Sequence, residues 1–283
     1  MLTADEPARD RSVTLLSGYR GDDRRIYATA FILFGIAAAF TARFVLSMSG
    51  GMSMPGRWTM SMMWMPMPGQ PWIEAAFVFL GMWVAMMIAM MLPSTLPMLL
   101  IYRRTLLFRQ VARPDLAMWS AAAGYFAVWT AFGVVVYALG ISLAKLAMAS
   151  AQISQGMPLL SGGALVLAGV YQLTPWKFAC LKHCRDPLHA LVHYQKSGAQ
   201  RREWISALRI GMEHGAFCAA CCWALMLIQM ILGVMSMAAM IGVAAVIAIE
   251  KLVVRGVLVA QLVGIAAIVG GLIVIVLSVG VRG

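Results

Sequence analysis

Hydrophobic positions in this chain fall into long unbroken runs rather than alternating stripes. The runs cover residues 26–46, 72–100, 116–148, 157–174, 205–232, 234–249 and 257–279. A helix that crosses the hydrocarbon core of a bilayer needs about 20 consecutive apolar residues. The pattern therefore predicts an all-α fold, a polytopic transmembrane helix bundle with about seven spans. The runs at 157–174 and 234–249 are the shortest and fit this length least well.

Composition and charge agree with a membrane protein. Hydrophobic residues make up 62% of the chain and charged residues 12%, against about 45–50% and 25% in soluble domains. Most basic residues lie in the N-terminal segment and in alternate loops, so the positive-inside rule predicts a cytoplasmic N-terminus. The predicted location is the bacterial inner (plasma) membrane, with the lipid bilayer as partner. Because the basic residues flank spans and form no patch interleaved with aromatic residues, no nucleic-acid binding is expected.

The predicted organisation is one membrane domain with three polar segments of interest. Residues 1–25 form a cytoplasmic tail, and residues 26–280 form a single transmembrane helical domain. An outer loop at 47–71 is rich in methionine, glycine and proline, which argues against a long regular element there. A basic inner loop spans 175–204. Glycines such as Gly124 and Gly211 lie inside spans and are expected to allow close helix packing.

All five cysteines and two of the four histidines lie in two short stretches. Thiolate and imidazole groups suit transition metals, Cu(I) and Zn(II) among them. Both stretches are expected at the cytoplasmic ends of their helices, where thiols stay reduced. They could therefore converge on one metal ion. The candidate ligands are Cys180, His183, Cys184, His214, Cys218, Cys221 and Cys222.

Helical geometry divides these candidates into faces. On a helix, His214, Cys218 and Cys221 lie within about 60° of one another, with Cys222 on the flank of that stripe. Cys180 and Cys184 are four residues apart and align on one face, while His183 points elsewhere. The alternative is that the cysteines are only small buried hydrophobic residues, a role that fits Cys222 best.

Methionines point to the identity of the metal. Fourteen of the 24 methionines lie between Met48 and Met98. In the second span Met82, Met86 and Met90 form a stripe with a spacing of four residues. Thioether sulfur is a soft ligand that selects Cu(I), so Cu(I) is favoured and Zn(II) is the alternative. Methionines in the span could instead be lipid-facing or core filler, whereas an exposed, flexible loop gives its methionines no packing role.

Four segments resemble a known group of proteins. They are the run WVAMMIAMMLPSTLP, the segment YQLTPWKFACLKHCRDP, the segment HGAFCAACCWALML and the Glu250–Lys251 pair. Over residues 72–251 the chain resembles a bacterial family of predicted metal-binding integral membrane proteins of uncharacterised function. The resemblance implies metal binding but no particular substrate or reaction. The methionine-rich outer loop lies outside the shared pattern.

These patterns favour a copper-handling membrane protein. Cu(I) would move, in either direction, between the outer methionine-rich loop and the cytoplasmic Cys/His cluster. The alternative is an assembly factor that delivers metal to a partner metalloenzyme or metallochaperone, and a membrane thiol redox protein ranks last. No nucleotide-binding loop and no carboxylate pair beside a nucleophile occurs in the sequence, so no enzymatic activity is expected.

Overall fold

The computed structural model describes residues 6–48, 50–65, 69–185, 203–253 and 255–280. Residues 1–5 of the predicted tail and residues 186–202 of the predicted inner loop lie outside these ranges. The described chain is helical apart from one small hairpin. Its helices are α1 (Glu6–Ser47), α2 (Trp72–Phe108), α3 (Pro114–Ala149), α4 (Ala151–Gln172), α5 (Pro175–Arg185), α7 (Glu203–Gly233), α8 (Met237–Leu252) and α9 (Gly256–Gly280).

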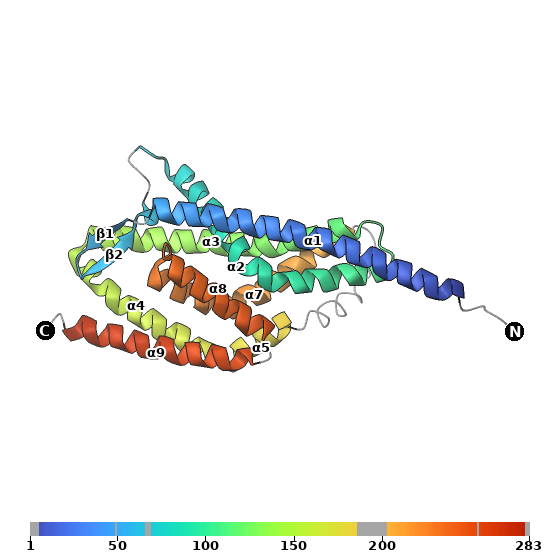
Figure 1. Ribbon diagram of the computed structural model, residues 1–283. Coiled ribbons are helices and arrows are strands. Elements are labelled where there is room, and N and C mark those ends of the chain that lie inside the picture. Colours follow the sequence, from blue (N-terminus) through green and yellow to red (C-terminus); the bar gives the residue numbers. More distant parts are fainter. Residues whose placement is uncertain (1–5, 49, 66–68, 186–202, 254, 281–283) are drawn as a thin grey trace.

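The long helices run roughly alongside one another and form an elongated bundle (Figure 1). The N-terminal end of α1 lies at one end of this bundle, and the hairpin and the C-terminal end of α9 lie at the other; the short helix α5 lies at the ends of α4 and α9 that are turned away from the hairpin. Helix α3 packs along α7, and α4 packs along α9. Helix α8 contacts α2, α5, α7 and α9, and Glu250 near its C-terminal end is 1% exposed.

Each predicted span corresponds to a helix, and six of the described helices are long and apolar enough to cross a membrane. These six are α2, α3, α4, α7, α9 and the part of α1 from Asp23 to Ser47. The remaining predicted span corresponds to α8, which has 16 residues and is shorter than the about 20 needed to cross the hydrocarbon core. The all-α prediction is confirmed. The orientation of the N-terminus stays a prediction.

Close packing of α3 against α7 depends on glycine. A Cβ atom added at Gly211 of α7 would overlap the backbone of Ala121 on α3. A Cβ atom added at Gly124 of α3 would likewise overlap the Leu208 carbonyl of α7. The two helix backbones therefore approach more closely than any larger residue allows, as the sequence predicted. This approach fixes the position of the helix that carries three of the cysteines.

Buried charge joins the first three helices at the end of the bundle that holds the N-terminus. Helix α1 continues from its apolar part back to Glu6, so the helix does not end at the predicted boundary of the tail. Arg103 of α2 is 1% exposed, and its guanidinium pairs with Asp115 at 2.6 Å and with Asp23 at 3.3 Å. These carboxylates compensate the guanidinium, because a buried charge without partners is costly.

The methionine-rich loop contains a small hairpin. Strands β1 (Gly51–Met54) and β2 (Trp58–Ser61) pair antiparallel and are followed by a 3₁₀ turn, Met62–Trp64. These elements are short, as the glycine and proline content predicted. However, Met60 is 3% exposed and Met63 is 8% exposed. The expectation that the loop gives its methionines no packing role is therefore wrong for these two, because the hairpin folds back onto the helices.

Candidate metal site

Thiols from two helices meet inside the bundle. Cys184 lies in the last turn of α5, and Cys218, Cys221 and Cys222 lie on α7; all four are free thiols. The Sγ atoms of Cys184 and Cys221 are 3.8 Å apart, and those of Cys221 and Cys222 are 3.3 Å apart. The three α7 cysteines are at most 1% exposed. We call Cys184, Cys218, Cys221 and Cys222 the thiol cluster.

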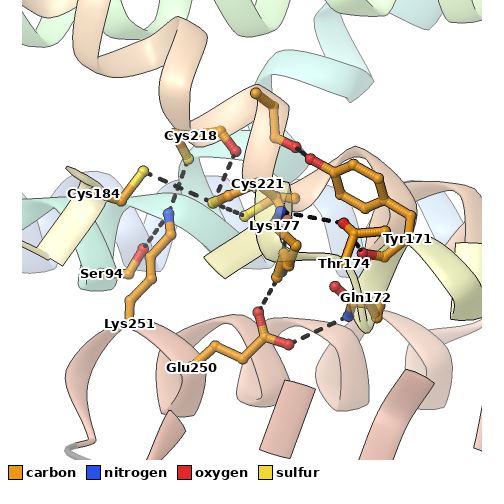
Figure 2. A network of polar contacts seen from close by, with 12 residues as sticks. Ser94, Tyr171, Gln172, Thr174, Lys177, Cys184, Cys218, Cys221, Glu250 and Lys251 are labelled. Atoms are coloured by element: carbon orange, nitrogen blue, oxygen red, sulfur yellow. Dashed lines mark hydrogen bonds and ion pairs between the residues drawn. The ribbon is translucent and has the colours of Figure 1, made fainter. Parts of the chain in front are cut away.

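A lysine reaches into the thiol cluster from α8. The Lys251 ammonium donates to the Cys218 sulfur at 2.9 Å and to Ser94 Oγ at 3.5 Å (Figure 2). It also lies 4.0 Å from Met91 Sδ. The hydroxyl of Tyr125 also lies 2.9 Å from the Cys218 sulfur. The Cys218 sulfur therefore contacts both a cation and a phenol.

Two histidines border the thiol cluster. The imidazole of His183 lies against the ring of Phe217 on α7, tilted by 32°, with 3.8 Å between ring centroids. The ring of His214 lies 5.8 Å from that of Tyr125. His183 Nε2 and His214 Nδ1 are buried atoms without a hydrogen-bond partner. Although His183 was expected to point away from the cysteine face, its ring lies against α7. Each unpartnered nitrogen is free to bind a soft metal ion.

Cys180 takes a different position from the other thiols. It lies one turn before Cys184 on α5, is partly exposed, and packs against the edge of the main hydrophobic core. The hydrogen bonds that connect Cys184, Cys218, Cys221 and Cys222 do not include it. The convergence predicted for the two cysteine stretches thus brings Cys184, rather than Cys180, to the α7 face.

The proton on Cys184 bears on how metal would bind. Its hydrogen bond with Cys218 and, further, its burial raise the pKa of the Cys184 thiol well above the usual value. Since a free cysteine has a pKa of about 8.5, Cys184 is protonated near neutral pH. Metal ligation requires the thiolate, so binding at Cys184 releases a proton.

A fully buried ion pair lies beside the thiol cluster and holds the backbone of α7 next to it. The ammonium of Lys177 on α5 lies 2.7 Å from Glu250 Oε2 of α8, and their side chains are 0% and 1% exposed. The same ammonium donates to the backbone carbonyl of Cys221 at 2.6 Å. Gln172 of α4 donates to the other Glu250 oxygen at 3.3 Å. Figure 2 shows that this network ties α4, α5, α7 and α8 together directly beside the sulfur atoms.

The charge of this pair is maintained by its surroundings. Burial lowers the pKa of Lys177, but Cys222 and the Glu250 carboxylate more than offset this, so the net pKa is raised. Lys177 therefore stays protonated, and its attraction to Glu250 persists in the interior. This keeps the Cys221 carbonyl bound to a cation.

The predicted methionine stripe is buried in the same core as the cysteines. Met82, Met86 and Met90 are 0%, 1% and 5% exposed, so they do not face lipid. Met87 and Met91 are 0% exposed as well and belong to the same hydrophobic core as Cys218, Cys221 and Cys222. Met91 is the methionine of α2 that reaches the Lys251 ammonium. The series of buried methionines from Met82 to Met91 thus reaches the lysine that contacts the thiol cluster.

The thiol cluster fits a soft metal after small side-chain movements. Among the described residues, no three or more His, Cys, Asp or Glu side chains form a group ready to hold a metal ion. However, two sulfurs bound at about 2.3 Å to one ion, the zinc–thiolate distance, are at most about 4.6 Å apart. The 3.8 Å between Cys184 and Cys221 meets this condition. The 3.3 Å between Cys221 and Cys222 meets it as well, whereas Cys218 could join only by exchanging its contact with the Lys251 ammonium for the metal.

Comparison with known proteins indicates what this chemistry serves. The family described as PpoB2, copper chaperone, matches residues 80–274. The chain belongs to this copper chaperone family. The match covers α2 from Leu80 onward through most of α9, and so includes every residue of the thiol cluster. Neither the curated proteins nor the solved structures contain a match. Membership in the copper chaperone family supports a role in copper handling and agrees with the metal inferred from sulfur chemistry.

Sequence analysis missed four side chains that line the thiol cluster. Tyr125 and Ser94 lie inside long apolar runs, where nothing in the local sequence distinguishes them. Lys177 and Lys251 were taken as part of the basic inner segments, because lysines near span ends usually face the cytoplasm. The adjacent Glu250–Lys251 pair closing an apolar run was the one signal that could have identified them. Two adjacent residues on a helix point in directions about 100° apart, here to Lys177 and to Cys218.

Proposed function

We propose that this protein is a membrane-embedded copper chaperone that holds Cu(I) at the thiol cluster and passes it to a partner metalloenzyme. The observation that carries the proposal is the meeting of Cys184 on α5 with Cys218 and Cys221 on α7. Thiolates select Cu(I), and buried thiols exclude water and oxidants. Zn(II) is the alternative cargo, but the methionines beside the cluster would contribute nothing to it.

The surroundings of the thiol cluster suit a metal that is held and then released. Lys251 places a positive charge 2.9 Å from Cys218, so the cluster has a counter-ion before copper arrives. The same ammonium can return to the sulfur when copper leaves, which lowers the cost of an uncompensated buried thiolate. His183 and His214 supply nitrogen ligands at the edge of the cluster. Exchange between ligands of similar softness allows stepwise transfer to a partner.

A Cys218→Ser/Cys221→Ser variant is expected to lose at least about 100-fold in Cu(I) affinity, because removing direct ligands exceeds the 10–100-fold effect of changing their neighbours. The measurement is competition against a chromophoric Cu(I) chelator, with the protein purified in detergent under reducing conditions. Cys180→Ser is the matched control and is expected to keep most of the affinity. A Cys180→Ser variant as weak as the double variant would contradict the proposed composition of the cluster.

Transport of Cu(I) is the second candidate function, and the buried methionines of α2 favour it. They form a series of thioethers inside the bundle that ends at Met91, next to Lys251. Thioethers bind Cu(I) weakly enough to let it move between neighbours. Copper would then pass along α2 between the hairpin end and the thiol cluster. Chaperone and transport functions share the cluster but differ in whether copper crosses the membrane.

Replacing Met91 separates these functions. If copper moves along α2, Met91→Leu is expected to slow Cu(I) entry into proteoliposomes by about tenfold or more, since one soft ligand is lost from the series. Met98→Leu is the matched control, because Met98 is also buried in α2 but packs in a separate hydrophobic cluster. If wild-type proteoliposomes take up no copper while a partner enzyme in cells loses activity on deletion of the gene, delivery is the function.

A further inference from the structure

The hairpin presents three methionines on one face. Met52 of β1 lies directly opposite Met60 of β2, and Met54 lies directly opposite Trp58. Residues two apart on a strand point to the same side of a hairpin, so Met52, Met54, Met60 and Trp58 share one face. Directly opposite residues have Cβ atoms about 4.5–5.5 Å apart. This brings three thioether side chains within reach of one ion.

The hairpin is held in place rather than free. The Trp58 indole nitrogen donates to the carbonyls of Ser154, at 3.0 Å, and Pro55, at 3.2 Å. The Ser154 hydroxyl, 0% exposed on α4, donates back to the Pro55 carbonyl at 2.8 Å. Gly56 has a φ of +101° and lies against α4 so closely that a Cβ atom would be 3.2 Å from the Ser154 carbonyl. The methionine face is therefore preorganised, which reduces the entropic cost of binding an ion.

Exposure changes gradually across the methionine face. Met60 is 3% exposed, Met54 is half-buried, and Met52 is 40% exposed. A site with one anchored ligand and one accessible ligand can accept an ion from solution. Packing explains Met60 but does not explain Met52, where an exposed thioether stabilises little and is open to oxidation.

We propose that Met52, Met54 and Met60 form a second Cu(I) site at the end of the bundle opposite the N-terminus, separate from the thiol cluster. The inference rests on the proposed copper function and assigns the place where Cu(I) is first bound. Three thioethers form a soft, uncharged ligand set suited to Cu(I) and to the similar ion Ag(I). The face of the Trp58 indole adds a cation–π contact at its edge. This site lies before residue 80, outside the part of the chain that matches the copper chaperone family.

The test uses the full chain in detergent and Ag(I) as a redox-inert probe. Equilibrium dialysis counts bound Ag(I) in the Cys218→Ser/Cys221→Ser background, which removes tight binding at the thiol cluster. Adding Met52→Leu, Met54→Leu and Met60→Leu is expected to remove about one further Ag(I) per chain, since leucine keeps volume but offers no lone pair. Met62→Leu is the matched control: Met62 is 44% exposed and follows β2 directly.

The outcomes are distinguishable from failure of the proposed function. Loss of one Ag(I) in the triple methionine variant, with Met62→Leu unchanged, supports the site. Equal Ag(I) binding with and without the three methionines overturns it, whatever happens at the thiol cluster. Conversely, failure of the cysteine variant to lower Cu(I) affinity overturns the proposed function alone. Should the triple variant lose its fold, Met52→Leu alone is decisive: an affinity for Ag(I) lowered about tenfold supports the site, and an unchanged affinity overturns it.

Discussion

A Glu250→Gln variant is expected to lose about 3–5 kcal/mol in free energy of unfolding, because it leaves the Lys177 ammonium buried without its counter-ion. Both side chains are at most 1% exposed, and 2.7 Å separates the charged atoms. Neither group can turn to water, since the pair lies among α4, α5, α7 and α8. The measurement is chemical unfolding in detergent, followed by tryptophan fluorescence.

Two further variants test the cause of this loss. A Lys177→Met/Glu250→Leu double variant removes both charges and is expected to recover most of the stability, because apolar replacements of a buried pair are often neutral. Glu213→Gln is the matched control, because Glu213 is exposed on α7. This substitution should change the free energy of unfolding by less than about 0.5 kcal/mol. A double variant less stable than Glu250→Gln would show that the charges themselves stabilise the bundle.

Replacing Gly211 by valine is expected to prevent α3 and α7 from packing as they do. The first atom of any side chain at this position would overlap the Ala121 backbone, and backbone, unlike a side-chain end, cannot rotate away. Overpacking typically costs about 1–3 kcal/mol where neighbours can shift, so a larger loss is expected here. A fall in melting temperature, or loss of the folded peak on size-exclusion chromatography in detergent, measures it.

Gly163→Ala provides the control for the glycine prediction. Gly163 lies within α4, and a Cβ atom there would meet nothing within 4 Å. Alanine is a better helix former than glycine by roughly 0.5–1 kcal/mol, so stability should stay the same or rise. A Gly211→Val variant as stable as Gly163→Ala would contradict the close approach of α3 and α7.

The sequence predicted the helices well because their signal is local. Each apolar run forms a helix whose ends lie near charged, glycine or proline residues. The length of such a run and the period of its hydrophobic pattern are enough to predict a helix. The meeting of Cys184 with Cys221 was also foreseeable in outline. Both stretches were expected at the same end of the bundle, where only a few helix ends are available to pack against each other.

The remaining features depend on tertiary packing. Tyr125 reaches Cys218 because α3 packs along α7, and Ser94 reaches Lys251 because α2 packs against α8. Met91, outside the predicted stripe, is the methionine of α2 that contacts Lys251. Because other helices pack against α2 on several sides, a single-face pattern does not identify it. The burial of Met60 depends on where the hairpin folds back, and the sequence of a glycine- and proline-rich loop does not determine this.

The thiol cluster has a thermodynamic consequence that follows from its assembly. Its ligands and supporting groups come from α2, α3, α5, α7 and α8, so an unfolded chain retains only two separate short ligand segments, Cys180–Cys184 and Cys218–Cys222. Copper therefore binds the native state more tightly than the denatured ensemble, and a ligand with this preference shifts the folding equilibrium toward the native state by mass action. Bound copper therefore raises the free energy of unfolding, and the protein without copper is the less stable form.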